Sequence, residues 1–343
     1  MIDSINIAVI GSSGFVGLEL IKILKKHKKV KIRYLCAKKS VGKSIVSFDK
    51  SLAGSKLPKI SSVAKIKWDL VDLVFTSLPN GEAQKISNKI PKRIKLIDLA
   101  GDFRLTSKKD YLKWYKKKHQ AVDKIKDAIY SIPEFNKRKI KKYKIISCPG
   151  CYPTSIQLPL IPLLKNNMVN EKRIIIDSKS GYSGAGKNFK KKFKFKNFFQ
   201  TISSYGISNH KHLGEIDQEL SIAKKRKLNI MFTPHLIPVF RGILTTIYLE
   251  PKNKYTAIKI YNYLRNFHKD NFFIKFSKFN TSINTEDVLN TNYCKISVCI
   301  NRSKDNIIIF SAIDNLQKGA SGQAVQNMNI LYGFKESEGL LWD

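Results

Sequence analysis

The stretch INIAVIGSSGFVGLELIKILKKH, residues 5–27, decides the fold of the N-terminal part of the chain. An apolar run of the kind found in buried strands is followed by glycines at G-x-x-G-x-x-G spacing and then by an apolar helical face. Strand, glycine turn and helix in this order form a dinucleotide-binding fingerprint, because the glycines let backbone N–H groups approach a pyrophosphate at the helix N-terminus. We therefore expect a cofactor at Gly11, Ser13, Gly14 and Gly17, and a plain tight turn is the alternative.

The second predicted strand, residues 30–36, ends without the acidic residue that NAD-binding domains usually place there. Lys38, Lys39 and Ser40 follow it instead. Cations and a hydroxyl suit a ribose 2′-phosphate, so the sequence favours NADP as the cofactor. The alternative is a solvated turn in a lysine-rich protein.

Two further strand-like runs, residues 71–81 and 94–105, end in polar loops. Ligands in open α/β sheets bind at the carboxyl ends of the strands, so we expect Ser77 and Pro79 to lie near the cofactor. Arg104 is one of few arginines, and its planar fork suits a phosphate or carboxylate. A surface salt bridge is the alternative for Arg104.

The bulk properties of the chain exclude several classes of protein. With 343 residues, 43% of them hydrophobic, it can bury the cores of two domains. We find no apolar run near the length of about 18 residues that a membrane span needs, and the N-terminus does not resemble a signal peptide. Five cysteines spread over a long chain do not look like a disulfide framework, so we expect a cytoplasmic protein with reduced thiols and no membrane partner.

The formal net charge of +37 is extreme. The lysines are scattered in short groups, and Ile, Asn, Phe and Tyr, which share A/T-rich codons with Lys, are also abundant. Genome composition therefore explains much of the charge, and we expect no nucleic-acid partner. We interpret KKFKFK, residues 191–196, as a half-buried strand or a subunit-interface segment, although such a pattern also suits single-stranded nucleic acid. The excess charge would still attract a phosphorylated, carboxylated substrate.

The stretch SCPGCYPTS, residues 147–155, holds two cysteines in a C-x-x-C spacing. Pro153 is well placed near a helix start, which puts Cys151 at or just before a helix N-terminus. The helix dipole there stabilises a thiolate, so Cys151 is a candidate nucleophile. Redox pairing with Cys148 is a second interpretation of the same spacing.

A nucleophilic cysteine usually needs a base, and the stretch YGISNHKHLGEI, residues 205–216, offers candidates. His210 and His212 stand close together, with Tyr205 and Glu215 nearby in the sequence. The two histidines and the two cysteines of the C-x-x-C also supply four formal zinc ligands. The sequence therefore leaves two interpretations: a nucleophile with its base, or a zinc site.

Six stretches together resemble one family, N-acetyl-gamma-glutamyl-phosphate reductase, the acyl-phosphate reductase of arginine biosynthesis. They are GSSGFVGLEL, PGCYPTS, KSGYSGAGK, HKHLGEI, FTPHLIPVFRGILTTIY and KGASGQAVQNMN. They occur in the family's order and span nearly the whole chain. Related semialdehyde and glyceraldehyde-phosphate dehydrogenases share the logic of the reaction, but not these cysteine and histidine motifs.

The resemblance implies a covalent mechanism. The Cys151 thiolate attacks the acyl phosphate and expels phosphate, and NADPH reduces the resulting thioester to the aldehyde. His210 is implied as the proton shuttle and His212 as a substrate contact. Arg104, Lys187 and Arg241 are candidate anion contacts, Tyr205 and Glu215 are further substrate-binding candidates, and Ser183, Gly184 and Asn315 are implied to approach the cofactor.

The resemblance also implies an architecture. We expect an α/β Rossmann-type NADP-binding domain at residues 1–150, to which a C-terminal helix at 315–343 returns. An α+β domain with a largely antiparallel sheet, residues 151–314, would bind substrate and form a homo-oligomer, either a dimer or a tetramer. No metal is expected.

Three questions stay open from the sequence. The same chemistry would serve a carrier-linked aminoadipyl phosphate in lysine biosynthesis, and a zinc-binding non-enzyme using Cys148, Cys151, His210 and His212 is the other alternative. The family pattern has Asn where Cys148 stands, so the C-x-x-C is an accident of that replacement. Cys148 is nevertheless placed to trap Cys151 as a disulfide under oxidation.

Overall fold

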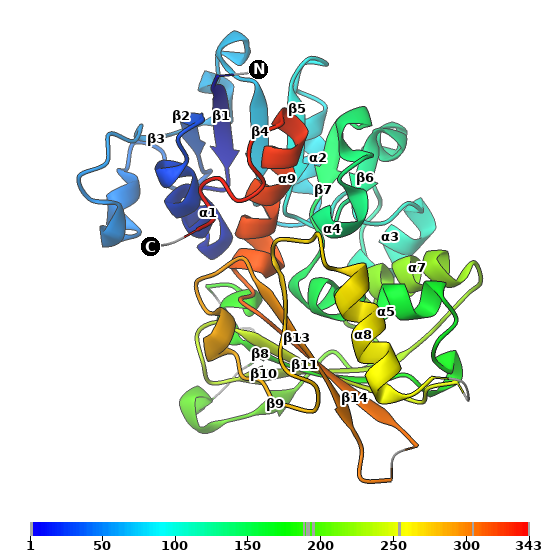
Figure 1. The fold of residues 1–343 in the computed structure, drawn as a ribbon. Helices are drawn as coiled ribbons and strands as arrows, with labels where there is room; N and C mark the ends of the chain where they lie inside the picture. Colours follow the sequence, from blue (N-terminus) through cyan, green and yellow to red (C-terminus); the bar gives the residue numbers. More distant parts are fainter. Residues whose placement is uncertain are drawn as a thin grey trace. The chain divides into compact units, whose positions relative to one another are not determined.

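The computed structural model describes residues 3–187, 189, 193, 196–252, 255–303 and 305–341. The chain divides into two compact units: unit 1 takes in Met1–Pro149 and Ala320–Asp343, and unit 2 is Gly150–Gly319 (Figure 1). Most of KKFKFK lies outside the described residues, so its interpretation stays a prediction. Within the described part of the chain, no helix combines the length and the apolar character needed to cross a bilayer.

Unit 1 contains a seven-stranded sheet with the order β3-β2-β1-β4-β5-β7-β6, in which every pair is parallel. Its strands are β1 (Ile5–Ile10), β2 (Val30–Cys36), β3 (Ile60–Ser61), β4 (Leu73–Thr76), β5 (Lys95–Asp98), β6 (Ala128–Tyr130) and β7 (Ile145–Ser147). The strand order reverses at β1, which is the switch point where ligands bind in such sheets. The predicted Rossmann-type fold is confirmed.

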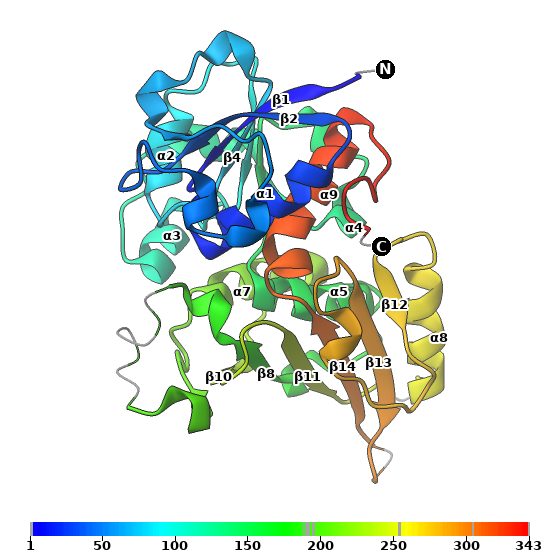
Figure 2. The ribbon, with the colours of Figure 1, turned by 90° about the vertical axis from the view of Figure 1, so that its left-hand side faces the viewer.

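Helices cover both faces of this sheet, and their bounds are α1 (Phe15–Lys26), α2 (Glu82–Ser87), α3 (Lys108–Tyr115), α4 (Pro133–Asn136) and α9 (Gly322–Tyr332). Helices α1 and α9 pack side by side on one face (Figure 2). On the other face, alternate strand residues such as Ala8, Val74 and Leu96 form a core with Ile86 of α2. Burial on both faces explains why the central strands β1 and β4 are nearly continuous apolar runs, whereas β2 alternates with exposed Lys31 and Arg33.

The glycine turn after β1 is packed too tightly for any side chain at two positions. Gly11 has φ +97°, and a Cβ there would lie 2.1 Å from the carbonyl oxygen of Ser77. A Cβ on Gly17 would lie 2.2 Å from the carbonyl oxygen of Gly11. The spacing of these glycines therefore lets β1, β4 and α1 meet with their backbones in contact.

Unit 2 contains a second seven-stranded sheet with the order β12-β13-β14-β11-β8-β10-β9. Its strands are β8 (Ile175–Gly181), β9 (Ser203–Ser204), β10 (Met231–Ile237), β11 (Ile243–Leu249), β12 (Ile274–Phe276), β13 (Cys294–Ile300) and β14 (Ile307–Ile313). The central pairs are antiparallel, whereas β8–β10 and β12–β13 are parallel. The predicted α+β unit with a largely antiparallel sheet is confirmed.

The three long helices of unit 2 pack together on one face of this sheet (Figure 1). They are α5 (Cys151–Lys165), α7 (His212–Lys224) and α8 (Ala257–Phe267). On the opposite, open face lie Ile175, Met231 and Tyr248, with exposed fractions of 43%, 62% and 42%. These three residues are neighbours across β8, β10 and β11, so they form one continuous apolar row.

Two buried acidic residues, Asp98 and Asp102, lie at and just after the carboxyl end of β5 in unit 1. Asp98 accepts hydrogen bonds from the Thr76 hydroxyl at 2.6 Å and from the Ala100 N–H at 3.1 Å. Asp102 accepts bonds from three N–H groups around the start of α2 and from the Tyr111 hydroxyl. Burial, together with the neighbouring Asp102, raises the pKa of Asp98 to about 7.

Asp98 makes stability depend on pH in a direction opposite to that of an ordinary salt-bridged acid. The folded chain holds the Asp98 proton up to about pH 7, against an ordinary pKa of 3.8, so the folded state binds more protons between these values. The free energy of unfolding should fall by about 2–3 kcal/mol from pH 5 to pH 8, relative to Asp98→Asn. Urea denaturation of both proteins measures this, and parallel pH curves would refute it.

Candidate active site

Cys151 is the first residue of α5, directly after the N-cap Gly150. The thiol forms no disulfide and is half-buried. Glycines crowd it: a Cβ on Gly319 would lie 2.7 Å from the Cβ of Cys151, and one on Gly184 would lie 4.0 Å from its Sγ. The positive end of the α5 dipole therefore faces a thiol on a tightly packed helix start, which favours the thiolate.

His212 lies against the residue that precedes the cysteine. A Cβ on Gly150 would lie 2.4 Å from His212 Nε2, so only glycine leaves room for this ring. Glu215 is fully buried, and its Oε2 accepts a hydrogen bond from the Gly150 N–H at 2.8 Å. The other carboxylate oxygen, Oε1, is 4.0 Å from His212 Nε2. One buried carboxylate thus contacts both the backbone of the nucleophile loop and the imidazole.

His210 has a different set of contacts. Its Nδ1 accepts a hydrogen bond from the His212 N–H at 3.2 Å, so it satisfies an N–H group at the start of α7. Its ring packs edge-to-face on Tyr152 and Tyr205, with centroid separations of 5.5 and 5.3 Å. His210 therefore packs against the two tyrosines and accepts one N–H bond at the first residue of α7.

A chain of two tyrosines runs beside the histidines. Tyr205 Oη donates to Tyr152 Oη at 3.2 Å, and Tyr152 Oη donates to the carbonyl oxygen of His235 at 3.0 Å. Burial raises the pKa of both phenols, and the nearby Cys151 adds to this. Both tyrosines therefore stay protonated at neutral pH and orient the ring stack.

The predicted residues Ser183, Gly184 and Asn315 come together in unit 2. Asn315 is buried, and its Nδ2 donates to Ser183 Oγ at 2.8 Å while its Oδ1 accepts from the Gly242 N–H at 2.7 Å. The Asn315 side chain thus fastens the loop after β8 to the start of β11. Gly184 is the member of this group that approaches the cysteine sulfur.

Arg241 lies in an ion pair within unit 2. Its Nη1 is 3.1 Å from Asp314 Oδ2 and donates to Asn290 Oδ1 at 2.7 Å. Asp314 is fully buried, so this pair helps hold the turn before β11.

The predicted cofactor residues of unit 1 lie at the carboxyl ends of its strands. The glycine turn follows β1, Ser77 and Pro79 follow β4, and Lys38 and Lys39 follow β2. The Lys38 side chain is 92% exposed, whereas Ser40 is buried at 7%. The lysines are therefore more accessible to a ligand than the hydroxyl of Ser40.

Cys148 and Arg104 are both buried in unit 1. Arg104 Nη2 donates to the carbonyl oxygen of Leu99 at 2.9 Å, and Asn327 Nδ2 lies 3.8 Å from Cys148 Sγ. Burial raises the pKa of Cys148 to about 12, and the Arg104 charge lowers it only in part. The attacking form of a thiol in disulfide exchange is the thiolate, so this burial disfavours Cys148 as the attacking group, and its trapping of Cys151 stays a prediction.

The zinc interpretation finds no support in the part of the chain that the structure describes. No three His, Cys, Asp or Glu side chains there are arranged to hold a metal ion. Cys148 belongs to unit 1, and Cys151 to unit 2 with His210 and His212.

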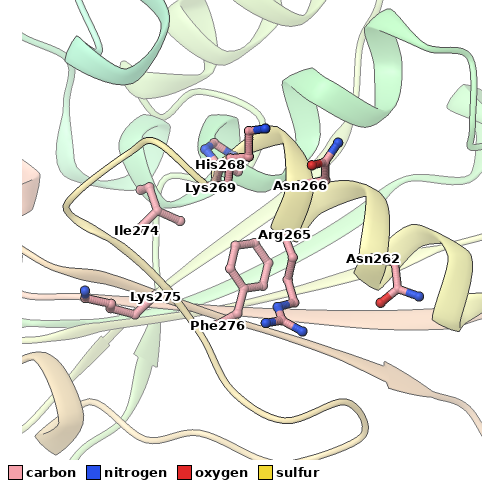
Figure 3. A pocket seen from close by; sticks show the side chains of 8 residues that line it. All are labelled: Asn262, Arg265, Asn266, His268, Lys269, Ile274, Lys275 and Phe276. Atoms are coloured by element: carbon pink, nitrogen blue, oxygen red, sulfur yellow. The ribbon is translucent and has the colours of Figure 1, made fainter.

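A pocket of about 540 Å³ in unit 2 involves none of these residues (Figure 3). It lies between α8 and β12, and Arg265 and Lys275 extend in different directions from it (Figure 3). Arg265 lies over the Tyr261 ring, and Lys275 lies over aromatic rings as well. The cations do not converge on one point, so we assign this pocket no part in the chemistry.

Sequence reasoning missed Tyr152, Gly150 and Gly319 as parts of the site. Tyr152 and Gly150 flank the cysteine in PGCYPT, which was a signal for both. Gly319 lies in the KGAS stretch, where its contact with Cys151 across 168 positions could not be seen without the fold.

Two domain families match successive parts of the chain. Residues 6–143 match the family described as semialdehyde dehydrogenase, NAD binding domain, and residues 151–315 match semialdehyde dehydrogenase, dimerisation domain. Among solved structures, aspartate semialdehyde dehydrogenase II from Vibrio cholerae, complexed with ASA, has a TM-score of 0.71 at 19% identity, covering 96% of this chain and 98% of that chain. That likeness establishes the shared fold.

Curated relatives are similar over nearly the whole length. The protein of Arabidopsis thaliana described as probable N-acetyl-gamma-glutamyl-phosphate reductase, chloroplastic, is 40% identical over 337 residues, which are 98% of this chain and 84% of the relative. The N-acetyl-gamma-glutamyl-phosphate reductase of Ehrlichia canis is 42% identical over 334 residues, 97% of this chain and 96% of the relative. On this similarity, the chain belongs to the N-acetyl-gamma-glutamyl-phosphate reductase family.

Proposed function

We propose that this chain reduces N-acetyl-L-glutamyl 5-phosphate to N-acetyl-L-glutamate 5-semialdehyde and phosphate, as a step of arginine biosynthesis. Unit 1 would hold the dinucleotide, and unit 2 would carry the covalent chemistry. The observation that carries the proposal is Cys151 at the start of α5, with His212 packed against Gly150 and Glu215 bonded to the same glycine. A nucleophile, a base and a group that orients them are the parts that covalent catalysis needs.

The residues of unit 2 have distinct tasks in this proposal. His212 takes the Cys151 proton, the thiolate attacks the acyl carbon, and His212 passes the proton to the departing phosphate. The acyl group is then held as a thioester on Cys151. Bound NADPH supplies the hydride that reduces the acyl carbon. When the C–S bond breaks, the aldehyde leaves and the Cys151 thiolate is restored.

NADP is the dinucleotide that the residues of unit 1 fit best. The glycine turn packs β1, β4 and the start of α1 with their backbones in contact, and a turn of this kind at a helix N-terminus suits a pyrophosphate. Lys38 and Lys39 stand where an NAD-binding domain would carry an acid. The family description, NAD binding domain, covers either dinucleotide.

The reverse reaction tests the activity directly. With N-acetyl-glutamate semialdehyde, phosphate and NADP, the wild type should produce NADPH, and Cys151→Ser should lose about 10³-fold or more of kcat because a serine hydroxyl is not ionised at neutral pH. Cys299→Ser, a buried thiol already near the Ser297 hydroxyl, is the matched control and should keep its activity. An inactive wild type, or one that accepts only a carrier-linked aminoadipate semialdehyde, would reject the proposed substrate.

His212, rather than His210, is the better-supported acid–base group. The sequence favoured His210, but its Nδ1 is engaged by the His212 N–H, whereas His212 faces Gly150 and Glu215. His212→Asn should lower kcat about 10²- to 10³-fold, while His210→Ala should chiefly cost about 1 kcal/mol of stability through the lost hydrogen bond to the His212 N–H. The pH profile of Cys151 alkylation by iodoacetamide should shift more in His212→Asn than in the His210 variant. The opposite ranking of the two variants would restore the original assignment.

The open face of the unit 2 sheet is proposed as the surface where two copies associate. The matching family is described as a dimerisation domain, and Ile175, Met231 and Tyr248 expose an apolar row there. A sheet covered by helices on one face can bury the other against a second sheet. Association of dimers into tetramers is a further expectation from the sequence.

A charge placed on this row should break the assembly. Met231→Asp should weaken self-association at least about tenfold, because a charge would be buried without a partner. Ile222→Asp on α7 is a matched control, since Ile222 is 60% exposed and Met231 is 62% exposed. Light scattering over a dilution series measures both variants. A monomeric wild type, or equal effects of the two substitutions, would move the interface elsewhere.

The cytoplasm is proposed as the site of this reaction. The five cysteines, all among the described residues, form no disulfide, which suits a reducing compartment.

A further inference from the structure

Three lysines from different elements of unit 1 surround one carboxylate. Lys38 follows β2, Lys85 lies in α2, and Lys117 follows α3. Lys85 Nζ is 2.8 Å from Glu82 Oε1, and Lys38 Nζ is 4.0 Å from Glu82 Oε2. The hydrogen bond from Lys85, and then the charges of all three lysines, lower the pKa of Glu82. We call Lys38, Lys85 and Lys117 the lysine cluster.

A pocket of about 330 Å³ lies beside this cluster. Its walls include Lys85, Lys117 and Lys118, with Glu82 as the single acid, so the lining carries a net positive charge. Asn80 also lines it, and its buried Nδ2 has no hydrogen-bond acceptor among the residues that the structure describes. Lys117 Nζ donates to the Asn80 carbonyl oxygen at 3.0 Å, which fixes this lysine at the rim.

The position of the cluster identifies the chemistry of its ligand. Lys38 stands at the carboxyl end of β2, where dinucleotide-binding sheets distinguish a ribose hydroxyl from a ribose phosphate. The pocket lies at the loop after β4, and the ion pair of Lys38 with Glu82 joins the two places. Compositional bias accounts for scattered lysines, but it does not account for three elements converging on one carboxylate.

We propose that Lys85 and Lys117, together with Lys38, form the binding site for the 2′-phosphate of the dinucleotide. The inference rests on the proposed function, and it assigns cofactor selectivity to α2 and to the segment after α3 as well as to the end of β2. A compact dianion is what several ammonium groups bind best. Glu82 holds the lysines in place without ligand, and competes with the phosphate for them.

Because Glu82 competes with the phosphate, substitutions of the lysines and of Glu82 should change the affinity for the phosphate in opposite directions. Lys85→Gln combined with Lys117→Gln should weaken binding of 2′,5′-ADP about tenfold, since each partly exposed charge contributes about two- to fivefold. Glu82→Gln should tighten binding several-fold, because it removes the negative charge nearest the phosphate. All of these effects should shrink with added salt, since the charges are accessible to solvent.

Isothermal titration of the full chain with 2′,5′-ADP, 5′-AMP and inorganic phosphate tests the site without turnover. Affinity for 5′-AMP should be the same in every variant. Lys89→Gln and Lys109→Gln are matched controls. Lys89 lies just after α2 and Lys109 lies in α3; both are exposed and do not line the pocket, so these substitutions should leave all affinities unchanged.

The possible outcomes separate this inference from the function on which it rests. A wild type that prefers 2′,5′-ADP, with no change in the double variant, would overturn the lysine cluster and leave the proposed NADP-dependent function intact. Equal loss of 5′-AMP and 2′,5′-ADP would show a structural effect and also overturn it. Strong binding of inorganic phosphate with no preference for 2′,5′-ADP would make the cluster a phosphate site. A wild type that binds both nucleotides equally would refute the NADP assignment itself.

Discussion

The hydrogen bond from the Gly150 N–H to Glu215 is the interaction on which the candidate active site depends. Gly150 is the N-cap of α5 and precedes Cys151, while Glu215 lies in the first turn of α7. The bond therefore fixes two helix starts against each other, one carrying the thiol and the other carrying His212. Glu215 is fully buried, and its contacts with Gly150 and His212 support a role in positioning these groups. The substrate contact that the sequence led us to expect stays a prediction.

The fold could be predicted where local signals are strong. The strand at residues 5–10, the strand at 30–36 and a helix starting at Cys151 follow from apolar runs, glycine spacing and a proline, all of which act over a few residues. The run HLIPVFRGILTTIYLE is largely apolar and β-branched, but the structure divides it into β10 and β11, with Gly242 at φ +103° just before β11. Gly181 packs against the backbone of Arg241 at this break, and no local pattern announces that contact.

The site was predictable as a set of residues but not as a set of contacts. Cys151 and the two histidines could be chosen by their chemistry alone. The division of labour between His210 and His212 depends on which ring receives the N–H at the start of α7, and that requires coordinates. Arg241 and Asn315 were chosen as ligand contacts, yet both make hydrogen bonds to distant buried partners. Such partners lie 73 or more positions away for Asn315, which is beyond the reach of any motif.

The difference in burial between the cysteines offers a way to measure the concentration of active protein. Cys36, Cys148, Cys294 and Cys299 are buried, whereas Cys151 is only partly so. A mild electrophile should therefore react once per folded chain, at the residue proposed as the nucleophile. The stoichiometry of labelling then reports the concentration of competent enzyme in a preparation, and a fluorescent acrylamide or iodoacetamide becomes an active-site titrant that needs no substrate.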